Sequence, residues 1–297
     1  MPENNLRAIA TMLTGVAFFA VLDTGLKYLT NDYPAIQVVA LRCFASLPFL
    51  LAPLLLRGGI GELAIRDLRP YLVRGALGVG VIWGYIHALS VQSLSITYAI
   101  YMAAPLLVAC LAVPFLGERV PARRWIAIAV GFAGVVVALD PGGDVVLEGA
   151  IAVIFSTICY GFTVIAVRYI GKADSTSAIV FWHLTMVGVV TLAIAFPGWK
   201  SIDPSDWPLI AVCGLTGALG QYCFTAAFRA ARAAAIVPFE YTAILWAIAI
   251  DWAIFALYPE VHVLTGAAII IAAGIYVIWD ESRSGNRLDL PARPDAD

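Results

Sequence analysis

Ionisable residues within the long apolar stretches of this sequence include Asp23, Lys27, Arg42, Glu240 and Asp251, and charges at such places are rare and usually have a function. Asp23 and Lys27 are four residues apart, so on a helix they share a face and are predicted to pair, although Lys27 lies near the outer end of its span and could instead extend to the membrane surface. Arg42 has three options for a partner, namely Asp23, a backbone carbonyl or a substrate carboxylate. Glu240 and Asp251 lie about three helical turns apart, hence on nearly the same face. That pair could form a proton relay or an amine-binding site, or it could make hydrogen bonds between helices.

Aromatic residues gather in the same stretches. Pro105 and Pro238 each remove a backbone hydrogen bond and predict a kink, which favours either a lined cavity or simple packing. Tyr98 and Tyr101 precede the first kink on roughly one helical face, and Tyr160 lies in another stretch. Such an aromatic, weakly polar pocket suits a small organic solute. The residues predicted to bind substrate are Trp83, Tyr85, His87, Tyr98, Tyr101, Gln221, Tyr222 and Glu240.

The elements that must position these residues are membrane-spanning helices. Hydrophobic residues make up 62% of the 297, charged residues only 13%, and the mean hydropathy is +0.90, which leaves too little polar surface to cover a soluble globule. A spanning helix needs about 20 apolar residues. We therefore expect an all-α integral membrane protein with ten spans, at about 7–30, 35–56, 70–92, 96–116, 122–139, 148–170, 176–196, 207–228, 233–257 and 261–279.

A repeat divides these spans into two halves. The tetrapeptide GALG at 75–78 returns at 217–220, AIA at 8–10 returns at 150–152, and Glu118 returns as Glu260, all at the same offset of 142 residues. Each half holds five spans, an odd number, so the second half enters the membrane from the opposite side. We predict two inverted repeats, 1–141 and 142–280, followed by a disordered, polar cytoplasmic tail at 281–297. Inverted repeats are typical of secondary transporters that bind substrate near the membrane midplane.

The distribution of charge predicts the orientation. With the N-terminus in the cytoplasm, only Lys27 and Lys200 of the 18 Lys and Arg residues fall on the outer side, and Arg42 falls within a span. Both termini are therefore expected in the cytoplasm, with the protein in a bacterial inner membrane. The net charge of -2 and the scattered basic residues argue against nucleic acid as a partner.

Other classes of function fit the sequence poorly. An ATP-driven pump would need a G-x-x-x-x-G-K-[ST] stretch, which the chain lacks. His87, His183 and His262 lie on different spans without ligand spacing, so we expect neither an enzyme nor a metal or cofactor site. A channel is less favoured because no ring of like charges or filter-like stretch is present.

The chain also resembles a known family over about residues 6–280. The stretches LGERVPARRWIAIAVGFAGVVVALDPGG, at the end of the first repeat, and AAAIVPFEYTAILW, in the second, are similar to the drug/metabolite transporter superfamily, specifically its EamA-domain exporters. The resemblance implies ten helices in two inverted halves around a central cavity. Its YddG-type branch lines that cavity with aromatic and His residues of the third and fourth spans, which points to Tyr85, His87, Tyr98 and Tyr101. One departure is LYPE, in place of the usual GE, at Glu260.

Together these observations predict a secondary transporter that exports small metabolites, most of all amino acids, by alternating access. The alternatives are export or import of an amine, a nucleobase-like or a drug-like compound. The partners expected are the small-molecule substrate and membrane lipid. The oligomeric state is left open, with a monomer as one option.

Overall fold

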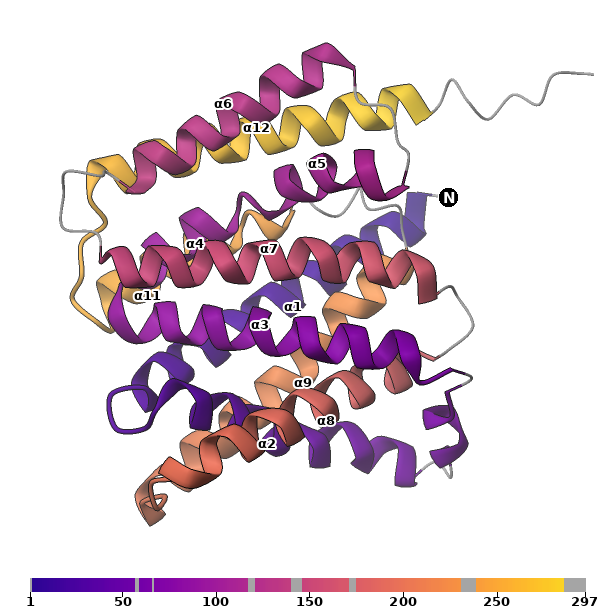
Figure 1. The fold of residues 1–297 in the computed structure, drawn as a ribbon, viewed down its shortest axis with the longest axis vertical. Coiled ribbons are helices and arrows are strands. Elements are labelled where there is room, and N and C mark those ends of the chain that lie inside the picture. The colour runs from indigo at the N-terminus through magenta and orange to yellow at the C-terminus, as the bar shows by residue number, and fades with distance from the viewer. Residues whose placement is uncertain are drawn as a thin grey trace, which may run out of the picture.

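The computed structural model describes residues 2–56, 59–65, 67–116, 121–139, 146–170, 175–230 and 239–285, and all regular elements in these ranges are helices (Figure 1). The α-helices are α1 (Pro2–Leu29), α2 (Ala35–Leu56), α3 (Arg69–Val91), α4 (Leu94–Tyr101), α5 (Ala104–Leu116), α6 (Ala122–Leu139), α7 (Leu147–Ile170), α8 (Thr176–Ala195), α9 (Trp207–Ala230), α11 (Ala243–Ala253) and α12 (Val261–Gly285). Short 3-10 helices are η1 (Ile60–Leu63), η2 (Phe196–Gly198) and η3 (Pro204–Asp206).

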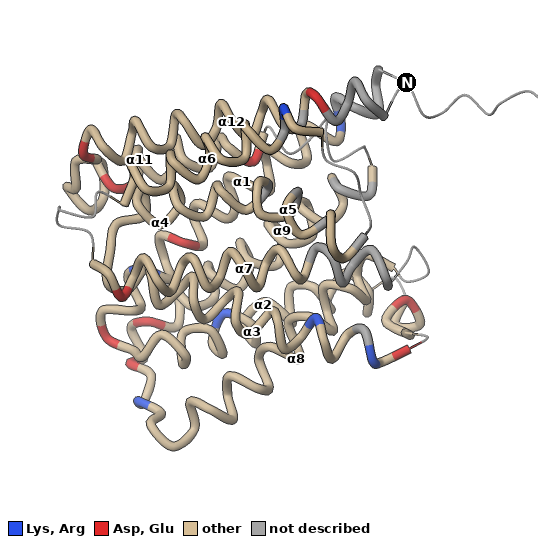
Figure 2. Tube along the Cα trace, turned by 45° about the horizontal axis from the view of Figure 1, so that its top comes forward, with Lys and Arg blue, Asp and Glu red and all other residues tan. Residues whose placement is uncertain are grey.

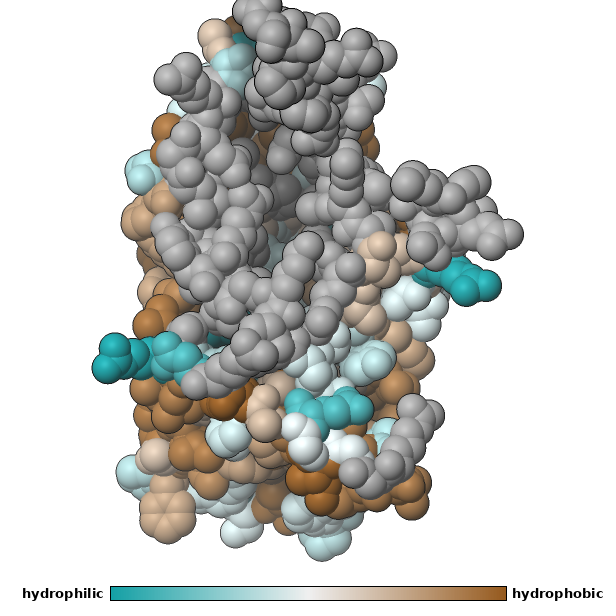
Figure 3. Space-filling view, turned by 90° about the vertical axis from the view of Figure 1, so that its right-hand side faces the viewer, coloured by the Kyte–Doolittle hydropathy of each residue, from teal (hydrophilic) through white to brown (hydrophobic). Residues whose placement is uncertain are grey.

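The helices have the length and composition of membrane spans. Within the described ranges, 6 segments are long and apolar enough to cross a bilayer, at Arg7–Leu29, Ala35–Leu56, Tyr71–Val91, Leu94–Phe115, Thr176–Gly198 and Pro204–Ala227. Shorter apolar helices lie at Trp125–Leu139, Leu147–Thr163, Ala243–Ala253 and Val261–Val277. Charged residues lie mainly towards the helix ends (Figure 2), and an end view shows hydrophobic residues reaching the outline of the molecule (Figure 3). The all-helical architecture expected from the sequence is confirmed.

Helices from the two halves of the chain pack in pairs. Helix α1 packs along α9, α3 along α7, α2 along α8, and α6 along α12. The first GALG lies on α3, where a Cβ at Gly78 would meet His183 Nδ1 of α8 at 3.0 Å. The second lies on α9, where a Cβ at Gly217 would meet Ser46 Oγ of α2 at 2.9 Å. Small residues thus allow the close approach that spanning helices need, because apolar side chains gain little by leaving lipid for protein.

The fourth predicted span is broken into two helices. Helix α4 ends at Tyr101 and α5 begins at Ala104, with a turn at 102–103 just before Pro105, so the chain departs from a straight helix where the proline predicts a kink. The kink predicted at Pro238 lies outside the described residues.

Two charged side chains, one partly buried and one fully buried, stabilise the preceding break between α3 and α4. Lys27 Nζ of α1 donates to the carbonyl oxygens of Gln92 at 2.5 Å and Leu89 at 3.3 Å, at the C-terminus of α3. Asp251 of α11 accepts from the backbone N–H groups of Leu94 (3.2 Å) and Ser95 (2.7 Å), at the start of α4. Each charge therefore complements the helix end that it meets. The sequence suits Asp251 to a proton relay, an amine-binding site or hydrogen bonds between helices, and in the structure it makes hydrogen bonds between helices.

Three apolar clusters form the core of the described residues, and Tyr85 lies where the two largest meet. One of these two includes Leu94, Leu106 and Ile270, and the other includes Leu22 and Ile86. Tyr85 packs against both of them. The polar groups around Tyr85 consequently lie at the junction of the two largest apolar clusters.

Candidate functional site

A buried carboxylate bound by two tyrosines lies at this junction. Asp23 of α1 is 6% exposed, and its Oδ2 accepts hydrogen bonds from Tyr98 Oη of α4 at 2.5 Å and from Tyr85 Oη of α3 at 2.9 Å. Charge-assisted hydrogen bonds of this kind offset part of the cost of burying a carboxylate. The predicted pairing of Asp23 with Lys27 is wrong, because Lys27 bonds the carbonyls at the end of α3.

The tyrosines continue as one aromatic cluster. The ring centroid of Tyr85 lies 6.1 Å from that of Tyr98 and 5.3 Å from that of Tyr101, and Tyr101 lies 5.6 Å from Tyr160 of α7. These separations are those of favourable edge-to-face or tilted ring pairs. Helices α3, α4 and α7 thus bring together three residues of the predicted site, and we call Tyr85, Tyr98, Tyr101 and Tyr160 the tyrosine cluster. Contact between this cluster and a substrate remains a prediction.

Glu240 lies beside the tyrosine cluster. Its carboxylate interacts electrostatically with the hydroxyls of Tyr101 and Tyr160. Its Oε1 is buried and accepts no hydrogen bond from any described residue. A buried acceptor without a donor costs free energy, so this oxygen is available to a bound molecule or to water.

Further buried polar atoms near the tyrosine cluster make no hydrogen bond to a described residue. Arg42 Nε, Arg74 Nε and His183 Nδ1 are buried and make no hydrogen bond to any residue that the structure describes. Arg74 and His183 are missing from the site predicted from the sequence. A usable signal was present for Arg74, because it lies within the apolar window Tyr71–Val91 and an arginine inside a span is rare.

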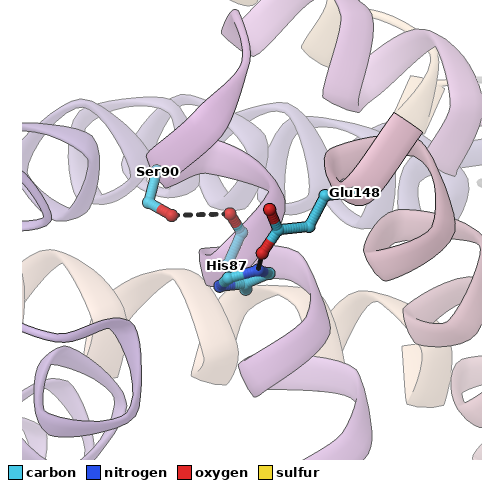
Figure 4. A network of polar contacts seen from close by, with 3 residues as sticks. All are labelled: His87, Ser90 and Glu148. Atoms are coloured by element: carbon cyan, nitrogen blue, oxygen red, sulfur yellow. Dashed lines mark hydrogen bonds and ion pairs between the residues drawn. The ribbon is translucent and has the colours of Figure 1, made fainter. Parts of the chain in front are cut away.

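Trp83 and His87 lie on a different face of α3 from Tyr85. Neighbours two positions apart on a helix point about 200° apart, so Tyr85 faces away from both. The Trp83 and His87 rings are stacked with centroids 5.5 Å apart, and His87 Nε2 lies 2.7 Å from Glu148 Oε1 of α7 (Figure 4). Glu148 is largely exposed, and Ser90 Oγ donates to the His87 carbonyl at 2.7 Å. The structure therefore separates Trp83 and His87 from the tyrosine cluster.

Tyr222 is separated from the tyrosine cluster as well. It is 46% exposed on α9 and extends a stripe of exposed apolar residues with Val212, Leu215 and Leu219. This spacing of three to four residues marks one outward face of a helix. Gln221, the next residue back along α9, is partly buried.

Comparison with known proteins assigns the family. A family model described as "EamA-like transporter family" matches residues 6–139 and 147–279. The chain belongs to this family. The two matched segments correspond closely to the two halves expected from the repeat, and the predicted membership in the drug/metabolite transporter superfamily is confirmed.

Relatives of similar length transport chemically different compounds. The chain is 25% identical to an S-adenosylmethionine uptake transporter of Rickettsia conorii, over 94% of this chain and 97% of that protein. It is 26% identical to a riboflavin transporter of Rhizobium johnstonii, over 93% and 92%. It is 23% identical to the pseudopaline exporter CntI of Pseudomonas aeruginosa, over 86% and 90%. The names of these EamA relatives point to a multi-pass membrane transporter of a small metabolite and not to an enzyme.

A solved crystal structure has the same fold. It aligns with a TM-score of 0.67 and 19% identity, over 95% of this chain and 99% of that chain. At this identity the match concerns the fold alone.

Proposed function

We propose that this EamA transporter carries an amino acid, or a metabolite containing an amino-acid group, across the bacterial inner membrane by alternating access, with export as its net direction. The observation that carries the proposal is the buried Oε1 of Glu240, which accepts no hydrogen bond from any described residue and belongs to a carboxylate that lies beside the tyrosine cluster. A substrate ammonium group would satisfy this carboxylate, and the tyrosine rings would pack against the rest of the solute.

The architecture we propose is ten spans in two inverted five-helix repeats. By their order in each half, α1, α2, α3 and α6 correspond to α7, α8, α9 and α12. The contact between α1 and α9 therefore has its equivalent in the contact between α7 and α3, and the contacts of α2 with α8 and of α6 with α12 are each between equivalent helices. Likewise, the contact of Gly75 with Met186 of α8 has its equivalent in that of Gly217 with Ser46 of α2. This symmetry supports repeats of residues 1–141 and 142–280 with the substrate between them.

We place both termini in the cytoplasm. The N-terminal end of α1 and the C-terminal end of α12 lie on the same side of the bundle (Figure 1), as an even number of spans requires. The excess of Lys and Arg in the predicted inner loops then indicates that this side of the bundle faces the cytoplasm.

Counterflow in proteoliposomes tests the proposal. Vesicles preloaded with one unlabelled solute would be tested for uptake of the labelled solute, over a panel of amino acids, amines, S-adenosylmethionine and riboflavin. We expect saturable counterflow of at least one solute that carries an amino-acid group, and net efflux of that solute from loaded cells. Counterflow confined to riboflavin would instead favour a carrier of flat heterocycles, for which the tyrosine cluster is the supporting observation. Flux that does not saturate would indicate a channel.

A further inference from the structure

Two arginines that form no ion pair with any described residue lie near the tyrosine cluster, Arg42 near Tyr101 and Arg74 near Tyr160. Arg74 of α3 is 8% exposed, and Arg42 of α2 is partly buried. Neither guanidinium forms a hydrogen bond or an ion pair with any residue in the described ranges, and the Nε atom of each is fully enclosed. A cation without a hydrogen-bonded anion is costly in a membrane interior, so these two guanidinium groups are suited to bind an anion or water.

His183 of α8 lies near both arginines. Its ring interacts electrostatically with both Arg42 and Arg74, and its Nδ1 is buried without a partner in the described structure. The imidazole packs on Gly78, one turn after Arg74 on α3, so the absence of a side chain at Gly78 makes room for it. Helices α2, α3 and α8 pack against one another and thereby hold the three side chains at one place.

The neighbouring carboxylates leave these cations unpaired. Asp23 interacts electrostatically with Arg42, but its Oδ2 already accepts from two tyrosine hydroxyls. Glu240 and Arg74 both lie near Tyr160, since Tyr160 interacts electrostatically with each of them. The interior therefore presents both a positive and a negative side chain near Tyr160.

We propose that Arg42, Arg74 and His183 form an anion subsite for the carboxylate of the transported solute. Guanidinium groups match a carboxylate well because their N–H donors form a planar fork. The carboxylate lies between the two arginines, the body of the solute lies on the tyrosine cluster, and its ammonium lies toward Glu240. The subsite deepens the proposed transport function and rests on it.

Binding of three simple probes to the purified protein in detergent tests the subsite without a transport assay. The probes are 3-phenylpropanoate, its neutral amide 3-phenylpropanamide, and phenethylamine, which share a phenyl group and differ in charge. We expect 3-phenylpropanoate to bind the wild-type protein at least about tenfold more tightly than the amide, because only the carboxylate pairs with the arginines. Equal binding of acid and amide, or no binding of the acid, overturns the subsite and needs no variant.

Substitutions then assign the residues. Arg74→Gln and Arg42→Gln should each weaken 3-phenylpropanoate by about tenfold or more and leave phenethylamine unchanged. Arg69→Gln, an exposed arginine at the start of the same helix as Arg74, is the matched control and should change neither. Undiminished acid binding in both glutamine variants overturns the assignment. If binding depends on the arginines but no solute shows counterflow, the subsite stands and the transport proposal is wrong. If counterflow occurs but binding does not depend on the arginines, the transport proposal stands and the subsite is wrong.

Discussion

Lys27 and Asp251, from α1 and α11, cap the two sides of the break between α3 and α4. Lys27 Nζ lies 2.5 Å from the Gln92 carbonyl, and Asp251 Oδ2 lies 2.7 Å from the Ser95 backbone nitrogen. These two residues therefore connect both halves of the chain to the segment that carries Tyr98. A membrane interior offers little water to satisfy a broken helix, so charged side chains do so instead.

Asp251→Asn should lower the stability of the folded protein by about 1–3 kcal/mol, because the amide loses the charge and one of the two acceptor oxygens that bind Leu94 and Ser95. Thermal unfolding in detergent measures the loss. Asp67→Asn is the control, since Asp67 accepts from the Arg69 backbone at an exposed site where water can replace the bond. Equal stability of the two variants would contradict a capping role for Asp251.

Tyr101→Ala should weaken transport of a bulky apolar amino acid by about tenfold in KM, because the ring contacts Tyr85 and Tyr160 within the tyrosine cluster and its loss removes a contact of about 1–3 kcal/mol. Tyr222→Ala removes the same type of side chain from the exposed stripe of α9 and should leave the KM unchanged. The opposite pattern would move the substrate site to the outer face of α9.

Glu240→Gln preserves the shape of the side chain and removes its charge. If the carboxylate carries a proton or binds the substrate ammonium, the pH dependence of counterflow for an amine-bearing solute should change. Glu148→Gln, at a largely exposed carboxylate, is the matched control. Wild-type counterflow by Glu240→Gln at every pH tested would exclude this carboxylate from the transport cycle.

Gly84→Ala should destabilise the protein by about 1–3 kcal/mol, since the added Cβ would lie 2.7 Å from the Ala152 carbonyl oxygen of α7 and force the packed helices apart. Gly61→Ala is the control because nothing lies within 4 Å of its added Cβ. Thermal unfolding compares the two variants, and similar melting temperatures would show that α3 and α7 tolerate a wider separation.

The orientation can be read from single-cysteine variants in a background without the native cysteines. Ser201→Cys lies in the exposed loop before η3 and should react with a membrane-impermeant maleimide added outside intact cells. Gly61→Cys lies in η1 and should react only after the cells are opened. Reaction of Gly61→Cys alone in intact cells would invert the proposed topology.

The sequence by itself determined the class of the protein. Its long apolar stretches indicate a helical membrane protein, because the backbone N–H and C=O groups of a chain in lipid must form hydrogen bonds within a helix or a closed barrel. The spacing along one helix also placed Tyr98 and Tyr101 together, since residues three apart share a face.

Only the tertiary structure decided which faces of different helices meet. Trp83, Tyr85 and His87 look equivalent in sequence, but the packing of α3 between neighbours turns Tyr85 towards Asp23 and the other two towards α7. Asp251 and Glu240 are predicted to share a face, but Asp251 caps the start of α4 whereas Glu240 lies beside the tyrosine cluster. Arg42, Arg74 and His183 are far apart in the chain and meet because α2, α3 and α8 pack together, a relationship between helices that the hydropathy of each helix does not encode.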